Sequence, residues 1–306
     1  MALALYTHPE MLDHRPTDGH AEQPGRLRAV TGALSEAFDL RLLRCEAPCI
    51  ETVDLLRVHD ESFVAALEAL APSSGIRSID PDTEMSAGSL VAARRAAGAV
   101  AAAARAVADG EIQRAFCAVR PPGHHAGPRT AMGFCLFSNV AVGARVAQSN
   151  GLSKVAVVDF DVHHGNGTQL VFEDDSTVFF ASVHESPAYP GTGDPDETGV
   201  GNVVNAIVAP QASRESWRAA FESLMGRVDA FSPDLILISA GFDAHARDPL
   251  AHQALEAEDF AWATRAIVSV ANRRCGGRIV SSLEGGYDLE ALGRSAVAHV
   301  RALQET

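Results

Sequence analysis

The sequence predicts a single α/β domain built around a mainly parallel sheet. Short apolar segments rich in β-branched residues alternate with helical segments rich in Ala, Leu and Arg along the 306 residues. Near-continuous apolar strands separated by helices are typical of a parallel sheet that is buried on both faces. No stretch is rich enough in Gly, Pro or Ser to act as a linker, so one domain over residues 1–306 is expected.

Each expected element follows from its local pattern. Seven short apolar runs predict strands. They cover residues 3–6, 115–119, 155–160, 178–182, 203–208, 235–239 and 278–282. Between them, apolar residues recur at helical spacing, which predicts six helices. These cover about residues 26–38, 61–70, 86–108, 138–148, 214–230 and 257–274.

The charge balance disfavours partners that carry many phosphates. The chain holds 25 Lys and Arg against 39 Asp and Glu, a formal net charge of −14 at pH 7. Such a chain has no bulk attraction for nucleic acid or anionic lipid, so neither is an expected partner. A neutral or cationic substrate suits this balance better. The content of 47% hydrophobic residues also excludes intrinsic disorder.

Several features indicate a cytoplasmic protein. The five cysteines are odd in number and include no Cys-x-x-Cys pair, so neither a disulfide framework nor a zinc finger is expected. Residues 1–8 lack the basic and apolar regions of a signal peptide. The Ala-rich stretch 87–108 is interrupted by Arg94, Arg95 and Arg105, which favours a packed helix over a membrane span.

Four of the expected strands lead directly into residues that can carry chemistry. The segments read Arg-Pro-Pro-Gly-His-His (120–125), Asp-Phe-Asp-Val-His-His (159–164), Ala-Gly-Phe-Asp (240–243) and Glu-Gly-Gly-Tyr (284–287). In open α/β sheets, ligands bind beyond the carboxyl ends of the strands. We therefore expect these His, Asp and Tyr side chains to share one rim of the sheet.

Three of these residues have the chemistry of a catalytic metal site. Asp161 and His163 are two apart in a segment expected to be extended, where alternation would point both to one side. Asp243 can supply a third ligand from a neighbouring strand end. Two carboxylates and one imidazole, with a position left open, suit Zn²⁺ or Fe²⁺.

A metal with two anionic ligands is a weak Lewis acid, so activation of water would need a strong helper base. The adjacent His124 and His125 offer one, on a turn that Pro-Pro-Gly makes rigid. Glycines before Tyr287 allow a close approach of its phenol to a substrate carbonyl. Because a phenol is a neutral donor at pH 7, it can stabilise a developing oxyanion.

Together these segments resemble the histone deacetylase superfamily, in particular its bacterial class II-like amidohydrolases and acetylpolyamine amidohydrolases. Two further motifs, Gly-Phe-Cys-Leu-Phe-Ser-Asn (133–139) and Pro-Gly-Thr-Gly (190–193), occur in the order of the family. The match runs from about residue 6 to residue 300. The resemblance implies an arginase-like three-layer α/β/α fold and a zinc-dependent amidohydrolase. It also implies an acylated lysine peptide or protein, or an acylated small amine, as substrate.

The resemblance assigns roles residue by residue. It makes Asp161, His163 and Asp243 the zinc ligands, His125 the general base and acid, and Tyr287 the residue that polarises the carbonyl.

The resemblance also implies different partners for the two adjacent histidines: Asp159 for His124, and Asn166 for His125. A carboxylate stabilises imidazolium and raises the pKa of a histidine, whereas a neutral amide does so much less. His125 is therefore expected to be the more readily neutral of the two, as a base must be.

Substrate-binding residues and a second ion follow from the same resemblance. Phe134, preceded by Gly133, matches with Tyr189 the aromatic pair that lines a narrow acyl-lysine tunnel. Asp159, Ser182 and the backbone carbonyls of Asp161, His163 and Val183 resemble a structural potassium site. Arg26 matches an arginine of an N-terminal signature, from which Ala21 and Gly25 depart.

The preferred substrate is an acetylated lysine ε-amine, with acetylpolyamines or other small acylated amines as the alternative. Polyamine-selective relatives carry an acidic gatekeeper seven residues after the metal-binding Asp, where this chain has Leu250. The sequence also lacks the long loop insertion of dimeric polyamine deacetylases. Two more distant alternatives are a two-manganese ureohydrolase, for which the additional Asp ligands are missing, and a metal-bound acyl-amine sensor without activity.

Overall fold

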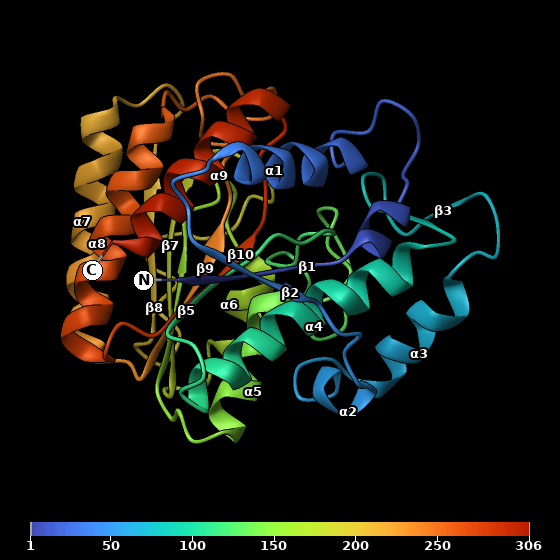
Figure 1. Ribbon diagram of the computed structural model, residues 1–306, viewed down its shortest axis with the longest axis horizontal. Helices are drawn as coiled ribbons and strands as arrows, with labels where there is room; N and C mark the ends of the chain where they lie inside the picture. Colours follow the sequence, from blue (N-terminus) through green and yellow to red (C-terminus); the bar gives the residue numbers. More distant parts are fainter. Residues whose placement is uncertain (1, 306) are drawn as a thin grey trace.

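The computed structural model describes residues 2–305 and contains an eight-stranded sheet between two layers of helices (Figure 1). The strands are β1 (Leu3–Thr7), β2 (Leu42–Glu46), β5 (Arg114–Cys117), β6 (Val155–Asp159), β7 (Val178–Glu185), β8 (Val203–Val208), β9 (Leu235–Ala240) and β10 (Ile279–Leu283). Their order in the sheet is β2-β1-β5-β10-β9-β6-β7-β8, and every neighbouring pair is parallel. The predicted α/β fold is confirmed.

Helices cover both faces of the sheet. On one face α4 (Ser89–Ala108) and α5 (Asn139–Ser149) pack against the central strands and against each other. On the opposite face lie α7 (Arg214–Phe231) and α8 (Ala257–Arg274), with α9 (Leu289–Gln304) between α8 and α1 (Pro24–Glu36). Connections carry η1 (Pro9–Asp13), α2 (Thr52–Leu55), α3 (Glu61–Leu70), α6 (Asn166–Phe172) and the antiparallel pair β3 (Ile76–Ser78) and β4 (Glu84–Ser86).

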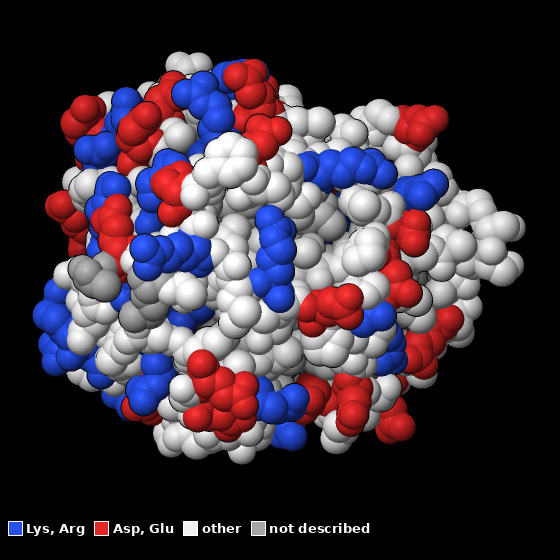
Figure 2. Space-filling view, in the orientation of Figure 1, with Lys and Arg blue, Asp and Glu red and all other residues white. Residues whose placement is uncertain are grey.

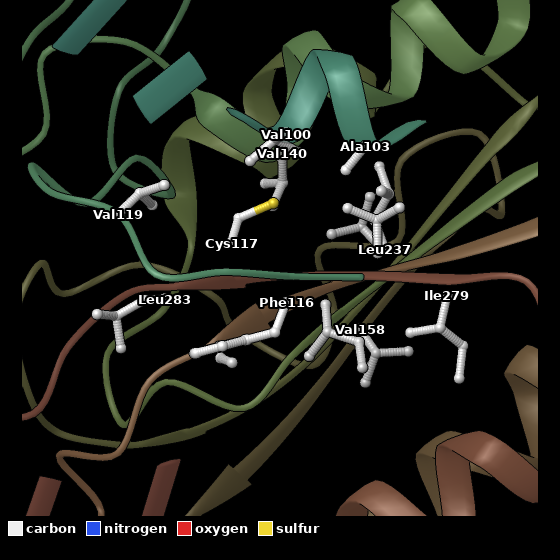
Figure 3. Packing of buried hydrophobic residues seen from close by; sticks show 14 of the residues in the cluster. Val100, Ala103, Phe116, Cys117, Val119, Val140, Val158, Leu237, Ile279 and Leu283 are labelled. Atoms are coloured by element: carbon white, nitrogen blue, oxygen red, sulfur yellow. The ribbon is translucent and has the colours of Figure 1, made fainter. Parts of the chain in front are cut away.

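The core fills the space on both sides of the sheet. In Figure 3, Cys117 and Leu237 point toward α4 and α5, where Val100 packs, whereas Phe116 and Leu283 point to the other side. All five side chains are buried. Alternate residues of each strand therefore enter two different apolar layers, which explains why the strands read as near-continuous apolar runs.

The surface differs from the core in its mixture of charges. Figure 2 shows acidic and basic side chains interspersed over the visible face. Exposed ion pairs of the protein include Arg301 with Asp39 and Arg265 with Glu305. None of the helices within residues 2–305 is long and apolar enough to span a membrane, and the Ala-rich α4 is a packed helix as predicted.

All seven expected strands and all six expected helices form, with ends shifted by a few residues. The expectations omit β2, α6 and α9, as well as the short elements η1, α2, β3 and β4. β2 is a largely exposed edge strand that contains Arg44 and Glu46, so it has no apolar run to reveal it. α6 begins at Asn166 within a Gly-Asn-Gly sequence typical of a turn. α9 does show helical spacing, with Leu292, Ala296 and Val300 buried against its neighbours.

Candidate active site

The four strands that lead into the motifs are neighbours at the centre of the sheet, in the order β5-β10-β9-β6. They are parallel, so their carboxyl ends meet at one edge. The segments that follow leave from this edge as turns and loops. The topology thus brings together side chains that are more than 100 residues apart in the sequence, as the motif positions predict.

Asp161, His163 and Asp243 form the one cluster of three potential metal ligands found within residues 2–305. One ligand atom from each lies within 4.8 Å of the others. His163 Nδ1 is 3.2 Å from Asp161 Oδ1 and 3.1 Å from Asp243 Oδ2. Both carboxylates are buried, and the His163 side chain is 13% exposed. The cluster is therefore shielded from water but reachable from one side.

The expectation of an extended segment at this cluster is wrong. The chain bends at residues 161–163 instead of continuing β6. The backbone N–H of His163 donates to Asp161 Oδ1 at 2.9 Å, which closes a tight turn. The turn, rather than strand alternation, directs Asp161 and His163 to the same side.

The donor set fits a divalent cation. Backbone N–H groups of Gly285 and Val162 orient the carboxylates of Asp161 and Asp243 at 2.8 and 2.9 Å. Burial lowers the pKa of His163, but the two carboxylates outweigh burial and raise this pKa well above its ordinary value. A positive charge is thus required between these three groups, because two buried carboxylates are costly without one. A cation bound to all three would supply it.

Glycines make room for this cluster. A Cβ atom at Gly285 would collide with the carboxylates of both Asp161 and Asp243, and one at Gly241 would collide with Asp161. Any side chain at either position would displace a ligand. The glycine that the sequence places after Glu284 is therefore explained by its close approach to Asp161 and Asp243.

The two adjacent histidines have the partners that the resemblance implies. His124 Nδ1 lies 3.1 Å from Asp159 Oδ2, and His125 Nδ1 lies 2.7 Å from Asn166 Oδ1. Since the Asn166 oxygen only accepts, Nδ1 of His125 is the donor, which leaves the lone pair on Nε2 free. His125, rather than His124, lines the pocket next to His163.

The two histidines differ in charge because their surroundings shift their pKa values in opposite directions. Burial lowers the pKa of His124, but the carboxylates of Asp161 and Asp159 outweigh it and raise the pKa to about 10. Burial raises the pKa of Asp159 to about 6 even against the facing His124. For His125, burial together with His124 and His163 holds the pKa well below its ordinary value. His125 is therefore a neutral acceptor beside a charged neighbour.

Tyr287 approaches the cluster from the end of β10. Gly286, which precedes it, has a φ of +122°, a conformation that favours glycine. The ring centroids of Tyr287 and Phe134 lie 5.8 Å apart, and the Arg26 guanidinium lies 4.8 Å from the centroid of the Tyr287 ring. Burial raises the pKa of Tyr287 well above its ordinary value although Arg26 opposes this. The phenol is thus protonated at neutral pH and available as a donor.

One pocket of about 200 Å³ is lined by His125, Phe134, His163 and Tyr287, among others. Tyr189 forms part of the wall and stands edge-on to His125, with ring centroids 5.1 Å apart. At Gly133, where φ is +56°, a Cβ atom would collide with the His125 ring, so this glycine lets the wall approach the histidine. The complete lining is Asp82, His125, Gly133, Phe134, His163, Tyr189, Leu250 and Tyr287.

The residues of the expected potassium site lie on β6, on the segment that follows it and on the neighbouring β7. Asp159 and Ser182 are partners in the register of β6 and β7, and Val183 follows Ser182. Ser182 Oγ lies 2.9 Å from His184 Nδ1, and Asp159 Oδ1 accepts the backbone N–H of Asp161 at 3.1 Å. Potassium at this place stays a prediction.

Sequence reasoning did not single out three acidic residues at the site. Asp82, from the turn between β3 and β4, lines the pocket. Glu284 Oε2 accepts the backbone N–H groups of Gly123 and His124 at 2.6 and 3.2 Å. Asp248 accepts the backbone N–H of Tyr287 at 2.7 Å. The last two lie within the quoted motifs or a few residues beyond, but their partners are backbone groups, which leave no mark in a sequence.

The chain is similar to known proteins of one family. Residues 20–303 match the histone deacetylase domain family. A probable deacetylase of Archaeoglobus fulgidus is 38% identical over 95% of this chain and 82% of its own length. A histone deacetylase-like amidohydrolase of Pseudomonas aeruginosa is 38% identical over 88% of this chain and 73% of its own length.

A solved structure gives the same result. The crystal structure of the HDA15 HD domain superposes with a TM-score of 0.92 at 38% sequence identity. The alignment covers 98% of this chain and 90% of that one. By family match, sequence identity and fold, the chain belongs to the histone deacetylase family.

Proposed function

We propose that the chain is a zinc-dependent amidohydrolase that removes acetyl groups from the ε-amine of lysine in peptides or proteins. Family membership supports a deacetylase or amidohydrolase. The observation that carries the finer proposal is the pocket, in which His125, His163 and Tyr287 meet at the base of a wall formed by Phe134 and Tyr189. A neutral acceptor, a metal ligand and a phenol donor thus face the same small volume.

The metal would be held by Asp161, His163 and Asp243. We propose Zn²⁺, with Fe²⁺ as the other ion that suits two carboxylates and an imidazole. The bound ion supplies Lewis-acid polarisation of the acyl oxygen and of the attacking water. Within residues 2–305 no second group of three potential metal ligands is found, which speaks against a ureohydrolase with two metal ions.

His125 is the proposed general base and acid. Its Nδ1 donates to Asn166, which holds the ring in the tautomer with Nε2 as acceptor. Nε2 takes the proton of the attacking water and later returns it to the leaving amine. His124, paired with Asp159, carries a positive charge that raises the electrostatic potential around the reacting carbonyl. Tyr287 donates a hydrogen bond from its phenol O–H to the oxygen on which negative charge develops.

The pocket walls suit a linear apolar stem. Phe134 and Tyr189 present ring surface on which the methylenes of a lysine side chain can be buried. Leu250, 40% exposed, stands at the mouth where it offers an apolar contact and no charge. Acylation turns the lysine ammonium into a neutral amide. This arrangement therefore supports an acylated lysine side chain over a substrate that carries a second, distant ammonium group.

One observation favours acetylpolyamines as the second candidate. Asp82 lines the pocket and its carboxylate could pair with a distant ammonium group of a polyamine. Burial raises the pKa of Asp82, as does its neighbour Asp80. Leu250 lines the same pocket and offers no charge, so lysine stays the first candidate.

Rates on an acetyl-lysine peptide and on acetylspermidine, measured side by side on the zinc-loaded protein, test this proposal. We expect the larger kcat/KM on the peptide. Leu250→Glu should move the ratio toward acetylspermidine by about fivefold, the effect of a partly exposed ion pair. A wild-type preference for acetylspermidine that Asp82→Asn removes would favour the second candidate. Zinc-loaded protein that hydrolyses neither substrate would contradict the proposed activity and support an acyl-amine sensor.

Asn166→Asp is expected to shift activity to higher pH. A carboxylate 2.7 Å from Nδ1 would stabilise the imidazolium of His125 and raise its pKa by at least about one unit. Because the base must be neutral, the acid limb of the kcat/KM profile should move upward by the same amount. Gln211→Glu, which adds one negative charge on an exposed loop, is the control. An unchanged acid limb in Asn166→Asp would show that His125 is not the base.

A further inference from the structure

One buried carboxylate connects the rim of the pocket to its catalytic tyrosine. Asp248 lies in the loop after β9 and is 8% exposed. Its Oδ1 accepts the backbone N–H of Leu250 at 3.0 Å, and its Oδ2 accepts the backbone N–H of Tyr287 at 2.7 Å. Leu250 and Tyr287 line the same pocket. Both oxygens of one side chain thus hold two residues that face the substrate.

The backbone at Tyr287 needs such an anchor. Gly285 and Gly286 precede it, and Gly285 is required for close approach to the metal cluster. Two successive glycines leave the chain free to adopt many conformations, and fixing them costs conformational entropy. The Arg26 Nε donates to the carbonyl of Gly286 at 2.7 Å, and the Asp248 carboxylate holds the next N–H. These two contacts hold the carbonyl and the N–H of the single peptide group that joins Gly286 to Tyr287.

A second contact between the loop after β9 and the segment after β10 is exposed and therefore weaker. Arg247, next to Asp248, pairs with Asp288 at 3.2 Å and with Glu290 at 2.9 Å. Its side chain is 47% exposed, and exposed ion pairs contribute little to stability. Hydrogen bonds from backbone N–H groups to a buried carboxylate are stronger, and their loss leaves buried donors without a partner. Asp248 is thus the stronger of the two anchors.

We propose that Asp248 is a positioning residue that sets the place of the Tyr287 hydroxyl and, through Leu250, the rim of the pocket. We call the Asp248 carboxylate with the N–H groups of Leu250 and Tyr287 the Asp248 clamp. A carboxylate is needed because both partners are donors, whereas the amide of Asn has only one acceptor atom. The inference rests on the proposed function, since it concerns the placement of the phenol for that reaction.

Asp248→Asn tests the clamp kinetically. Its amide nitrogen would face one of the two N–H groups, so the segment that carries Tyr287 should shift. We expect kcat on the acetyl-lysine peptide to fall by about 10- to 100-fold, because displacements of about 1 Å have such effects. KM should change by less than about threefold, since the substrate stem still contacts Phe134 and Tyr189. Arg247→Gln, which breaks the exposed contact of the same loop, is the control and should stay near wild type.

A double variant separates positioning from general loosening of the structure. If Asp248 acts through the Tyr287 hydroxyl, Asp248→Asn should lower kcat by less than about threefold once Tyr287 is already Phe. An equal loss in both backgrounds would overturn the proposal. So would an effect of Asp248→Asn confined to KM.

Hydrogen exchange supplies a readout that does not depend on activity. In Asp248→Ala the amides of Leu250 and Tyr287 should exchange at least about tenfold faster, while the β10 amides keep wild-type protection. Faster exchange at these amides supports the clamp even if the wild-type protein hydrolyses no acyl amine, in which case the proposed function fails and the clamp does not. Unchanged exchange at Tyr287 overturns the clamp even if the enzyme is fully active.

Discussion

Replacing Tyr287 with Phe is expected to lower kcat by about 10²–10³-fold, the usual cost of removing one oxyanion donor. The ring would still pack against Phe134 and Arg26, because the substitution removes only the hydroxyl. That hydroxyl belongs to a phenol whose pKa is raised by burial, so wild type presents it as a neutral donor. Metal content and thermal stability should stay close to wild type. Steady-state kinetics on an acetyl-lysine peptide, with metal analysis of the same samples, would measure both.

Tyr6→Phe provides a matched control for this variant. Tyr6 is buried in β1, away from the pocket lining, and loses the same single hydroxyl. Its turnover should equal that of wild type. Near-wild-type turnover of Tyr287→Phe would contradict the assigned role of the phenol. A loss of metal from Tyr287→Phe would instead indicate that the hydroxyl supports the metal cluster.

The sequence predicts the position of the site well because parallel strands end at a common edge. Asp161, Asp243, His125 and Tyr287 each follow a strand that its apolar run identifies, and adjacent parallel strands then bring them together. The local conformation was less predictable. Alternation along an extended strand cannot be distinguished from a turn closed by a side-chain oxygen, which is how His163 reaches its position.

Contacts that run through the backbone account for most of what the sequence did not reveal. Asp248 and Glu284 act by accepting N–H groups from segments about 40 and 160 residues away. Any residue except Pro can provide such a donor, so no residue type marks the partner. Their burial, at 8% and 0% exposed, is likewise a property of the fold.

The N-terminal signature likewise depends on buried contacts that the sequence does not reveal. Glu22 is fully buried and binds Arg120 with both carboxylate oxygens, at 2.8 and 2.7 Å, and Arg26 at 3.2 Å. Burial would raise the pKa of Glu22, but Arg120 and His14 hold it well below its ordinary value. This network connects the N-terminal segment to the loop that carries the histidine pair. The departures at Ala21 and Gly25 from the resembled signature leave in place Glu22 and Arg26, the two signature residues that form this network.

Asp243→Asn is expected to abolish tight metal binding and to lower activity by at least about 10³-fold, since the metal contributes several kcal/mol of charge stabilisation. The amide can still accept the N–H of Val162, so the fold should persist. Only one carboxylate, that of Asp161, would then remain to balance a divalent charge. Chelator competition and activity at fixed zinc would measure the two effects.

Without metal, we expect Asp243→Asn to have no harmful effect on stability. Burial and the neighbouring Asp161 raise the pKa of Asp243, which means that two carboxylates in this cluster repel each other. Asp243→Asn should therefore unfold at the same or a higher temperature than wild type after chelation. Zinc should raise the melting temperature of wild type only, because a ligand at about 1,000 times its Kd adds about 4 kcal/mol to stability.

Asp196→Asn, which removes a carboxylate from an exposed turn, controls for the change in net charge. It should bind zinc and gain stability from it like wild type. A zinc-dependent rise in melting temperature that survives in Asp243→Asn would place the metal elsewhere. If chelated Asp243→Asn were instead much less stable than chelated wild type, Asp243 would owe its presence to its contact with His163 and not to a cation. The two stability measurements therefore distinguish a metal ligand from a structural aspartate without any assay of catalysis.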